Sequence, residues 1–113
     1  MSKFDEKVAL YKNFMDDKNI SFDADLLKAV TKGLGPSIYK RDAETVSGSD
    51  PKELETVKKN FLIKKLGLSD SPKLDDAIAK VVDKIGKSER SKYRAVVYYL
   101  LVKEFNKESV YGM

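Results

Sequence analysis

The sequence predicts an all-α protein, a compact bundle of about five short helices in a single domain over residues 1–113. In several stretches apolar residues recur three or four positions apart, which is the spacing of one face of an α-helix. Residues that favour helix starts precede these stretches, and glycines follow them. Hydrophobic residues make up 42% of the chain and charged residues 35%, so the chain can bury a core and keep a solvated surface.

The first helix is expected at about 3–18, and the segment 1–22 comprises this helix and its connection to the next. Ser2 is a suitable amino-terminal cap because its hydroxyl can accept a hydrogen bond from a free backbone N–H. The core face consists of four residues at helical spacing, widened by two more: Phe4, Val8, Tyr11 and Met15, with Leu10 and Phe14. Asp23 can cap a second helix that ends at Gly33.

The stretch Gly33-Leu34-Gly35-Pro36 has two interpretations. Gly33 can close the second helix in a left-handed conformation, and Pro36 prevents the helix from continuing. A phosphate-binding turn is the alternative, but it needs its glycines between a strand and the start of a helix. Because the preceding segment is helical, we expect a helix stop, and nucleotide binding remains the less favoured interpretation.

Residues 36–50 are expected to form a short helical turn followed by a loop, which we place at 40–50. Ile38 and Tyr39 are the large apolar residues of this segment. We expect both side chains to anchor the segment in the core.

A third helix is predicted over 51–66, with Asp50 as its cap, Pro51 in its first turn and Gly67 at its end. Its apolar residues are expected to share one face: Leu54, Val57, Phe61, Leu62 and Leu66. Its lysines are expected outside the core: Lys58, Lys59, Lys64 and Lys65, with Lys52. The net charge of the chain is +4. Such a basic face either binds the phosphates of nucleic acid or is simply a solvated surface, and we favour the solvated surface.

A fourth helix is predicted from Ser71-Pro72 to Gly86, and a fifth from about Ser88. The fourth has the clearest apolar stripe of the chain: Leu74, Ala77, Ile78, Val81, Val82 and Ile85. The fifth contains eight consecutive apolar residues, AVVYYLLV, at 95–102. Valine and tyrosine also favour strands, but the charged flanks of this segment are helical in character and no partner strand is evident. A helix with this run has no polar side for two turns, so it must be covered on all sides.

The apolar run predicts self-association. We expect a bundle of five short helices to leave one side of the run uncovered, and a twofold interface would bury it. The chain is therefore predicted to form a homodimer. The expected interface residues are Tyr98, Tyr99, Leu101, Val102 and Phe105.

Catalysis is not expected. The chain has no cysteine and no histidine, which removes thiolate nucleophiles, the imidazole base, disulfides and almost every ordinary zinc site. The pairs Asp16-Asp17 and Asp75-Asp76 are neighbours on helices, so their side chains diverge by about 100° instead of converging on a metal or a substrate. We predict no catalytic residue, no metal and no cofactor. The charged start of the chain and the lack of a long apolar run predict a cytoplasmic protein without a membrane segment.

Three segments resemble a family of small bacterial proteins defined only as a domain of unknown function, number twenty-eight fifty-three. These segments are GLGPSIY, GSDPKELETVKKNFLIKKLGL and GKSERSKYRAVVYYLLVKEFNKESVY. The likeness covers most of residues 26–111. It implies a compact, all-helical and dimeric domain and carries no catalytic or binding residue. Taken together, we predict a non-enzymatic protein that acts through protein–protein contacts, first with itself, and a nucleic-acid-binding protein is the alternative.

Overall fold

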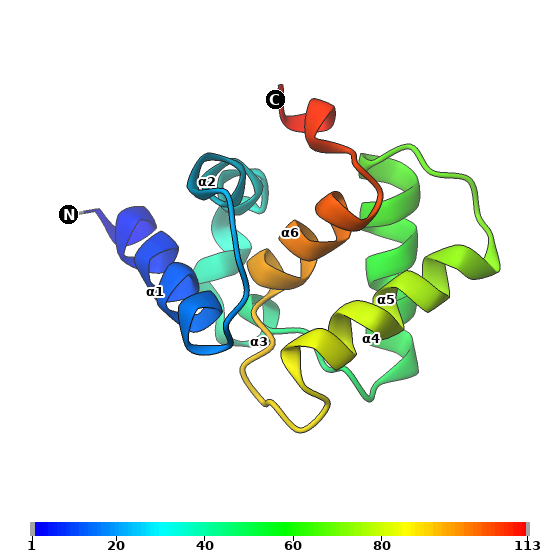
Figure 1. Cartoon of the computed structure of the whole chain (residues 1–113), viewed down its shortest axis with the longest axis horizontal. Coiled ribbons are helices and arrows are strands. Elements are labelled where there is room, and N and C mark those ends of the chain that lie inside the picture. The colour runs from blue at the N-terminus through cyan, green and yellow to red at the C-terminus, as the bar shows by residue number, and fades with distance from the viewer. Residues whose placement is uncertain (1, 113) are drawn as a thin grey trace.

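Helix α6 (Arg94–Glu104) runs through the middle of the molecule, and the other helices pack around it (Figure 1). The computed structural model describes residues 2–112, except for the side chains of Arg41 and Asp42. The other α-helices are α1 (Lys3–Asp17), α2 (Ala24–Gly33), α3 (Arg41–Glu44), α4 (Pro51–Thr56) and α5 (Pro72–Ile85). Two 3₁₀-helices and one π-helix complete the set: η1 (Gly35–Tyr39), η3 (Glu108–Tyr111) and the π-helix η2 (Val57–Lys65).

The predicted all-α class is confirmed. Between residues 2 and 112 the structure has no strand, and a single isolated β-bridge joins Thr45 to Tyr93. Five helical rods correspond to the five predicted helices, because α4 continues directly into η2. The predicted loop at 40–50 differs in that it contains the single helical turn α3. No helix in the described part of the chain is long and apolar enough to cross a membrane.

The caps form at three of the predicted helix starts. The Ser2 hydroxyl accepts a hydrogen bond from the backbone N–H of Asp5, at 3.1 Å. The Asp23 carboxylate caps α2, and the Asp50 carboxylate caps α4 in the same way. These side chains satisfy backbone donors that a helix start leaves free, which is why the starts were readable from residue types. Ser71 makes no such cap, although α5 begins next to it.

The end of α2 differs from the prediction. Gly33 is the last residue of the helix and has no positive φ, whereas Gly35 adopts φ +64°. Leu34 keeps a right-handed conformation, so the chain passes from α2 into η1 before it turns. Gly33 lies close to the Tyr111 ring, and a Cβ added there would be 3.4 Å from that ring.

The rod that was predicted as an α-helix over 51–66 is a π-helix in its second half, η2. The side chains of Val57, Phe61, Leu62 and Leu66 are all buried. In an α-helix, Val57 and Leu66 would point in opposite directions, because nine residues at 100° make two and a half turns. At roughly 82° per residue, the i→i+5 hydrogen bonding of a π-helix returns Leu66 to the side of Val57. The wider turn therefore lets all four side chains face the core.

Helix α6 begins at Arg94, later than the predicted start near Ser88. The intervening residues are held by other contacts. The Val46 N–H donates to the Lys92 carbonyl at 2.7 Å, and the Lys92 ammonium bonds to two carbonyls of its own loop, those of Lys87 and Glu89. These bonds engage carbonyl groups that a longer helix would have used for its own hydrogen bonds.

The chain buries the apolar run of α6 by itself. All eight residues from Ala95 to Val102 are buried, within a core to which α1, α2, η2 and α5 contribute. The stripe of α5 faces the same core, as predicted: Leu74, Ala77, Ile78, Val81, Val82 and Ile85 are buried. The expectation that five short helices would leave one side of α6 uncovered was wrong, because the rods cross around α6 instead of lying along one side of it (Figure 1).

Candidate functional site

Two large apolar side chains are exposed in the part of the chain that the structure describes, and they lie together. Leu10 of α1 is 38% exposed, and Tyr39 at the end of η1 is 46% exposed. Both line a groove of about 410 Å³, together with Lys3, Glu6 and Lys7. We call this the Leu10–Tyr39 groove.

Tyr39 was predicted to anchor its segment in the core, and this was wrong. Ile38 is buried as expected. Successive residues of a 3₁₀-helix point about 120° apart, so the turn that buries Ile38 directs Tyr39 outward. Adjacent residues of this turn therefore cannot both face the core, and the Tyr39 side chain lines the groove.

A partly buried polar network holds α1 beside the groove. Glu44 of α3 accepts hydrogen bonds from Lys7 Nζ at 2.7 Å and from the Tyr11 hydroxyl at 2.8 Å, both on Oε2. Burial raises the pKa of Tyr11 well above its ordinary value, and the bond to the Glu44 carboxylate raises it further. The Tyr11 ring packs against the Tyr93 ring with 5.0 Å between centroids. The network fixes which side of α1 faces outward.

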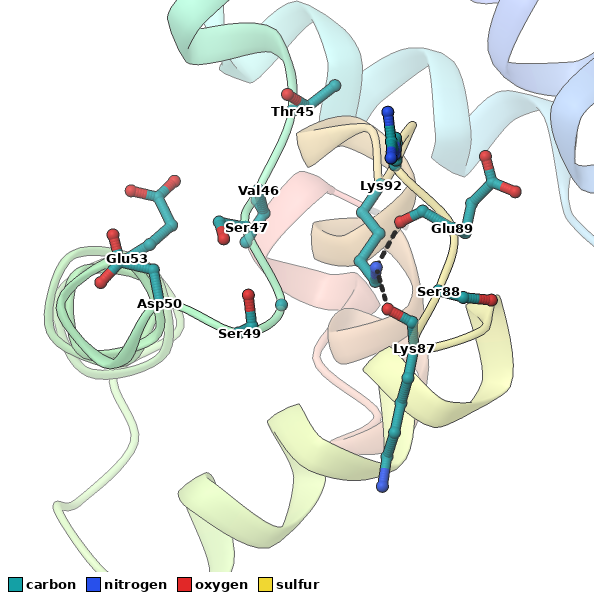
Figure 2. A pocket seen from close by; sticks show the side chains of 12 residues that line it. Thr45, Val46, Ser47, Ser49, Asp50, Glu53, Lys87, Ser88, Glu89 and Lys92 are labelled. Atoms are coloured by element: carbon teal, nitrogen blue, oxygen red, sulfur yellow. Dashed lines mark hydrogen bonds between the residues drawn. The ribbon is translucent and has the colours of Figure 1, made fainter.

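A second cavity, of about 500 Å³, lies between the loop 45–50 and the loop 87–92 (Figure 2). Lys92 is 4% exposed, and its ammonium donates to the Lys87 carbonyl at 2.9 Å and to the Glu89 carbonyl. Figure 2 shows this side chain reaching between the two loops, whereas the Lys87 side chain points away from it. Lys92 thus stabilises the loop instead of presenting a charge to a ligand.

The carboxylates that line this cavity also have partners within the chain. Asp50 caps α4, and Glu53 accepts from Arg94 of α6. Glu89 accepts from Lys18 at 2.8 Å, and this bond, followed by the bond from the Ser91 N–H, lowers the pKa of Glu89. The lining has three cationic and three anionic side chains: Lys87, Arg90 and Lys92, with Asp50, Glu53 and Glu89. The cavity therefore favours neither a cation nor an anion.

Metal coordination has no candidate site in the described residues, where no group of three or more acidic side chains could hold an ion. Asp16 and Asp17 are both exposed on α1. Asp75 takes part in an ion pair with Lys58, at 3.2 Å. The adjacent acidic pairs thus lie on the surface.

The four lysines predicted as a polyanion-binding face are divided by the structure. Lys58 is only 12% exposed and pairs with Asp70 at 3.0 Å and with Asp75. The hydrogen bond to Asp70 and then that to Asp75 raise the pKa of Lys58. Lys59 and Lys64 are exposed, and Lys65 is exposed over the Tyr111 ring, 5.3 Å from its centroid. Lys58 therefore does not belong to a free basic face.

Four of the five residues predicted to form a self-association interface are buried within the chain. Tyr98, Tyr99, Leu101 and Val102 are buried, none more than 7% exposed, and Phe105 is half-buried. The Tyr98 ring stacks on the Phe61 ring with centroids 3.9 Å apart, and the Tyr99 hydroxyl accepts a hydrogen bond from the Asp23 N–H at 2.7 Å. Contacts within the chain bury four of these side chains, which leaves Phe105 as the one with substantial exposed surface. Self-association itself stays a prediction.

Sequence reasoning missed the Leu10–Tyr39 groove, although half of it had a signal. On a helical projection, Leu10 lies roughly 130° from the centre of the face formed by Phe4, Val8, Tyr11 and Met15. Such an angle predicts exposure, so the prediction that Leu10 widens the core face was wrong. The position of Tyr39 had no comparable signal, because the direction of a side chain in a five-residue 3₁₀ turn depends on how the turn packs.

Comparison with known proteins agrees with the resemblance seen in the sequence. No curated protein matches the chain. A family described as "Protein of unknown function (DUF2853)" matches residues 10–109, which span most of the chain and include both Leu10 and Tyr39. The chain belongs to this family.

Proposed function

We propose that this protein is a non-enzymatic, cytoplasmic interaction protein that acts through protein–protein contacts, first with a second copy of itself, and that the Leu10–Tyr39 groove is its contact surface. One observation carries the proposal. The two large apolar side chains that are exposed in the described part of the chain lie in the same groove. Single exposed apolar residues are ordinary on protein surfaces, whereas their clustering beside a groove is typical of contact sites.

The composition of the groove suits a protein partner. Tyrosine is enriched in interfaces because its ring contributes apolar area while its hydroxyl remains available for a hydrogen bond. Lys3 and Glu6 provide a polar rim around Leu10 and Tyr39. The apolar patch is small, so we expect weak association, with a dissociation constant that is roughly micromolar or higher.

Sedimentation equilibrium from micromolar to millimolar concentration tests the proposal. A dimer has a mass of 25.6 kDa, twice the 12.8 kDa of one chain. We expect the mean mass to rise above 12.8 kDa with concentration, and Leu10→Gln and Tyr39→Ser to abolish the rise. The matched control is Lys84→Gln, because Lys84 is an exposed residue of α5, and this variant should associate like the wild type. A mass of 12.8 kDa throughout would overturn the proposal.

Nucleic-acid binding remains the second candidate, favoured by the exposure of Lys59, Lys64 and Lys65 along η2. If these three lysines contacted phosphates, the logarithm of the affinity would fall against the logarithm of salt concentration with a slope of about −2.7. Fluorescence anisotropy with a labelled duplex measures that slope. Binding that is lost when the three lysines are replaced by glutamine would favour this candidate over protein contacts.

A further inference from the structure

Helix α1 carries a line of five exposed residues on its outer side. These residues, which we call the outer stripe, are Lys3, Glu6, Leu10, Asn13 and Asp17. They are spaced three, four, three and four positions apart, which keeps them on one face of the helix. Three of them, Lys3, Glu6 and Leu10, line the Leu10–Tyr39 groove. Because α1 lies at the edge of the molecule (Figure 1), the outer stripe is accessible to a second protein.

The outer stripe is complementary to itself in reverse. If a second α1 ran antiparallel with the two Leu10 side chains in contact, Lys3 would lie opposite Asp17 of the partner subunit, seven residues from the centre in each chain. Glu6 would lie within one residue, about 1.5 Å along the axis, of Asn13 of the partner subunit. A parallel arrangement in the same register would instead place each lysine against a lysine and each aspartate against an aspartate.

The end charges of α1 also point to a partner. Lys3 stands at the amino end of the helix, where the helix dipole is positive, and Asp17 stands at the carboxyl end, where it is negative. Both charges are therefore unfavourably placed, and the last turn contains no basic residue. An antiparallel second helix brings an opposite charge and an opposite dipole end to each of them.

The neighbouring lysines do not supply this compensation within the chain. Lys7 is paired with Glu44 at 2.7 Å, and Lys18 with Glu89 at 2.8 Å. Among the side chains that the structure describes, which exclude those of Arg41 and Asp42, neither Lys3 nor Asp17 takes part in an ion pair. Their charges thus remain available for a second copy.

We infer that two copies of this chain pair through antiparallel α1 helices, with Leu10 on the twofold axis and Lys3 against Asp17 of the partner subunit on both sides. The inference rests on the proposed function and names its partner and register. Tyr39 lies beside the amino-terminal half of α1 and thus flanks the carboxyl-terminal half of the second helix.

Charge reversal tests the register. Lys3→Glu and Asp17→Lys should each weaken dimerisation by roughly fivefold or more, since each replaces two ion pairs by two repulsive pairs. The double variant Lys3→Glu/Asp17→Lys should return to within about twofold of the wild type. Both single changes place a favourable charge at a helix end, so the folded monomer should melt at the same temperature or higher. Weaker dimerisation combined with an unimpaired monomer cannot be explained by damage to the fold.

Asp16→Lys is the matched control for Asp17→Lys. Asp16 is exposed and carries the same charge at the same end of α1, but it points about 100° away from the outer stripe. Its reversal should change the dissociation constant by less than twofold. An equal effect at both aspartates would mean that net charge, and not the register, governs association, and would overturn the inference.

Cross-linking gives an independent measurement of orientation. The natural chain has no cysteine, so Lys3→Cys and Asp17→Cys variants each carry one thiol. A short bis-maleimide should link the two variants to each other in an equimolar mixture and link neither variant efficiently to itself. Self-linking of Lys3→Cys would show a parallel pair and overturn the inference.

Failure of the register and failure of the proposed function have different outcomes. If Leu10→Gln abolishes association but the double charge reversal does not restore it, the register is wrong and the groove remains the contact surface. If the wild-type chain stays at 12.8 kDa, the proposed function fails and the register fails with it.

Discussion

The Tyr11 hydroxyl donates a hydrogen bond to Glu44 Oε2 at 2.8 Å, although the two residues lie 33 positions apart in the chain. Lys7, one turn before Tyr11 on α1, donates to the same oxygen. The bond joins a fully buried ring of α1 to the single helical turn α3. Because it fixes the rotation of α1 about its axis, it also determines that the outer stripe faces away from the core.

Replacing Tyr11 by phenylalanine should destabilise the fold by about 1 kcal/mol at pH 7, because Glu44 loses one of its two donors while the ring remains. The folded-state pKa of Tyr11 is raised, so the contribution of this group is fully present below its ordinary pKa near 10 and is lost as the pH rises above that value. The stability difference between wild type and Tyr11→Phe should therefore narrow at pH 11. Urea unfolding at both pH values measures it, and a constant difference would contradict the linkage.

Replacing Lys92 by methionine should destabilise the fold by about 1–3 kcal/mol, since it removes the donor to the Lys87 and Glu89 carbonyls. The methionine keeps most of the apolar stem of the side chain. Lys87→Met is the control, because the Lys87 side chain is exposed, and it should change stability by less than about 0.5 kcal/mol. Thermal melts of the two variants compare them directly. Equal effects would mean that Lys92 does not stabilise its loop.

Replacing Gly35 by alanine should destabilise the fold by about 1 kcal/mol or more, because Gly35 has φ +64°. Gly33→Ala should be neutral or stabilise slightly, by up to about 1 kcal/mol, since Gly33 is helical and the new Cβ would make an ordinary contact with Tyr111. The same melts with millimolar ATP test the phosphate-turn alternative. We expect no shift with ATP, and a wild-type shift that disappears in either variant would revive that alternative.

Replacing Leu66 by alanine should cost about 2–5 kcal/mol, as expected for a buried leucine. This large loss depends on the π-helical turn of η2, which brings Leu66 to the same side as Val57. Lys64→Ala is the control on the exposed side of η2 and should cost less than about 0.5 kcal/mol. Urea denaturation gives both values. A small loss at Leu66 would argue for α-helical geometry across the whole rod.

The starts of α1, α2 and α4 were predictable because capping is local, whereas α6 has no side-chain cap and begins later than predicted. Ser2, Asp23 and Asp50 act on N–H groups two or three residues further on, so no distant contact is needed. The stripe of α5 was equally clear, because one buried face with 3.6-residue periodicity leaves a strong pattern. The spacing of Val57, Phe61, Leu62 and Leu66 fits one face of a π-helix, but the prediction assumed the 3.6-residue period of an α-helix.

The candidate site was less predictable, because the exposure of a side chain depends on which other elements of the fold pack against it. Lys58 does not contribute to a free basic face because it forms ion pairs with Asp70 of the following loop and Asp75 of α5. Ile38 and Tyr39 are adjacent large apolar residues, yet the Ile38 side chain is buried and the Tyr39 side chain is exposed. Nothing within a few residues of any of these positions distinguishes the outcomes.

By itself, the sequence determined the all-α class, the starts of α1, α2, α4 and α5, the helix-ending glycines Gly67 and Gly86, and the need to cover the run at 95–102 completely. Each of these follows from interactions over a few residues or from the free energy of exposing apolar area. Only the tertiary structure decided that the same chain covers α6, and that Leu10 and Tyr39 are left exposed together. The reason is that coverage depends on the crossing of helices distant in sequence, and the pattern of one helix contains no information about which neighbour will reach it.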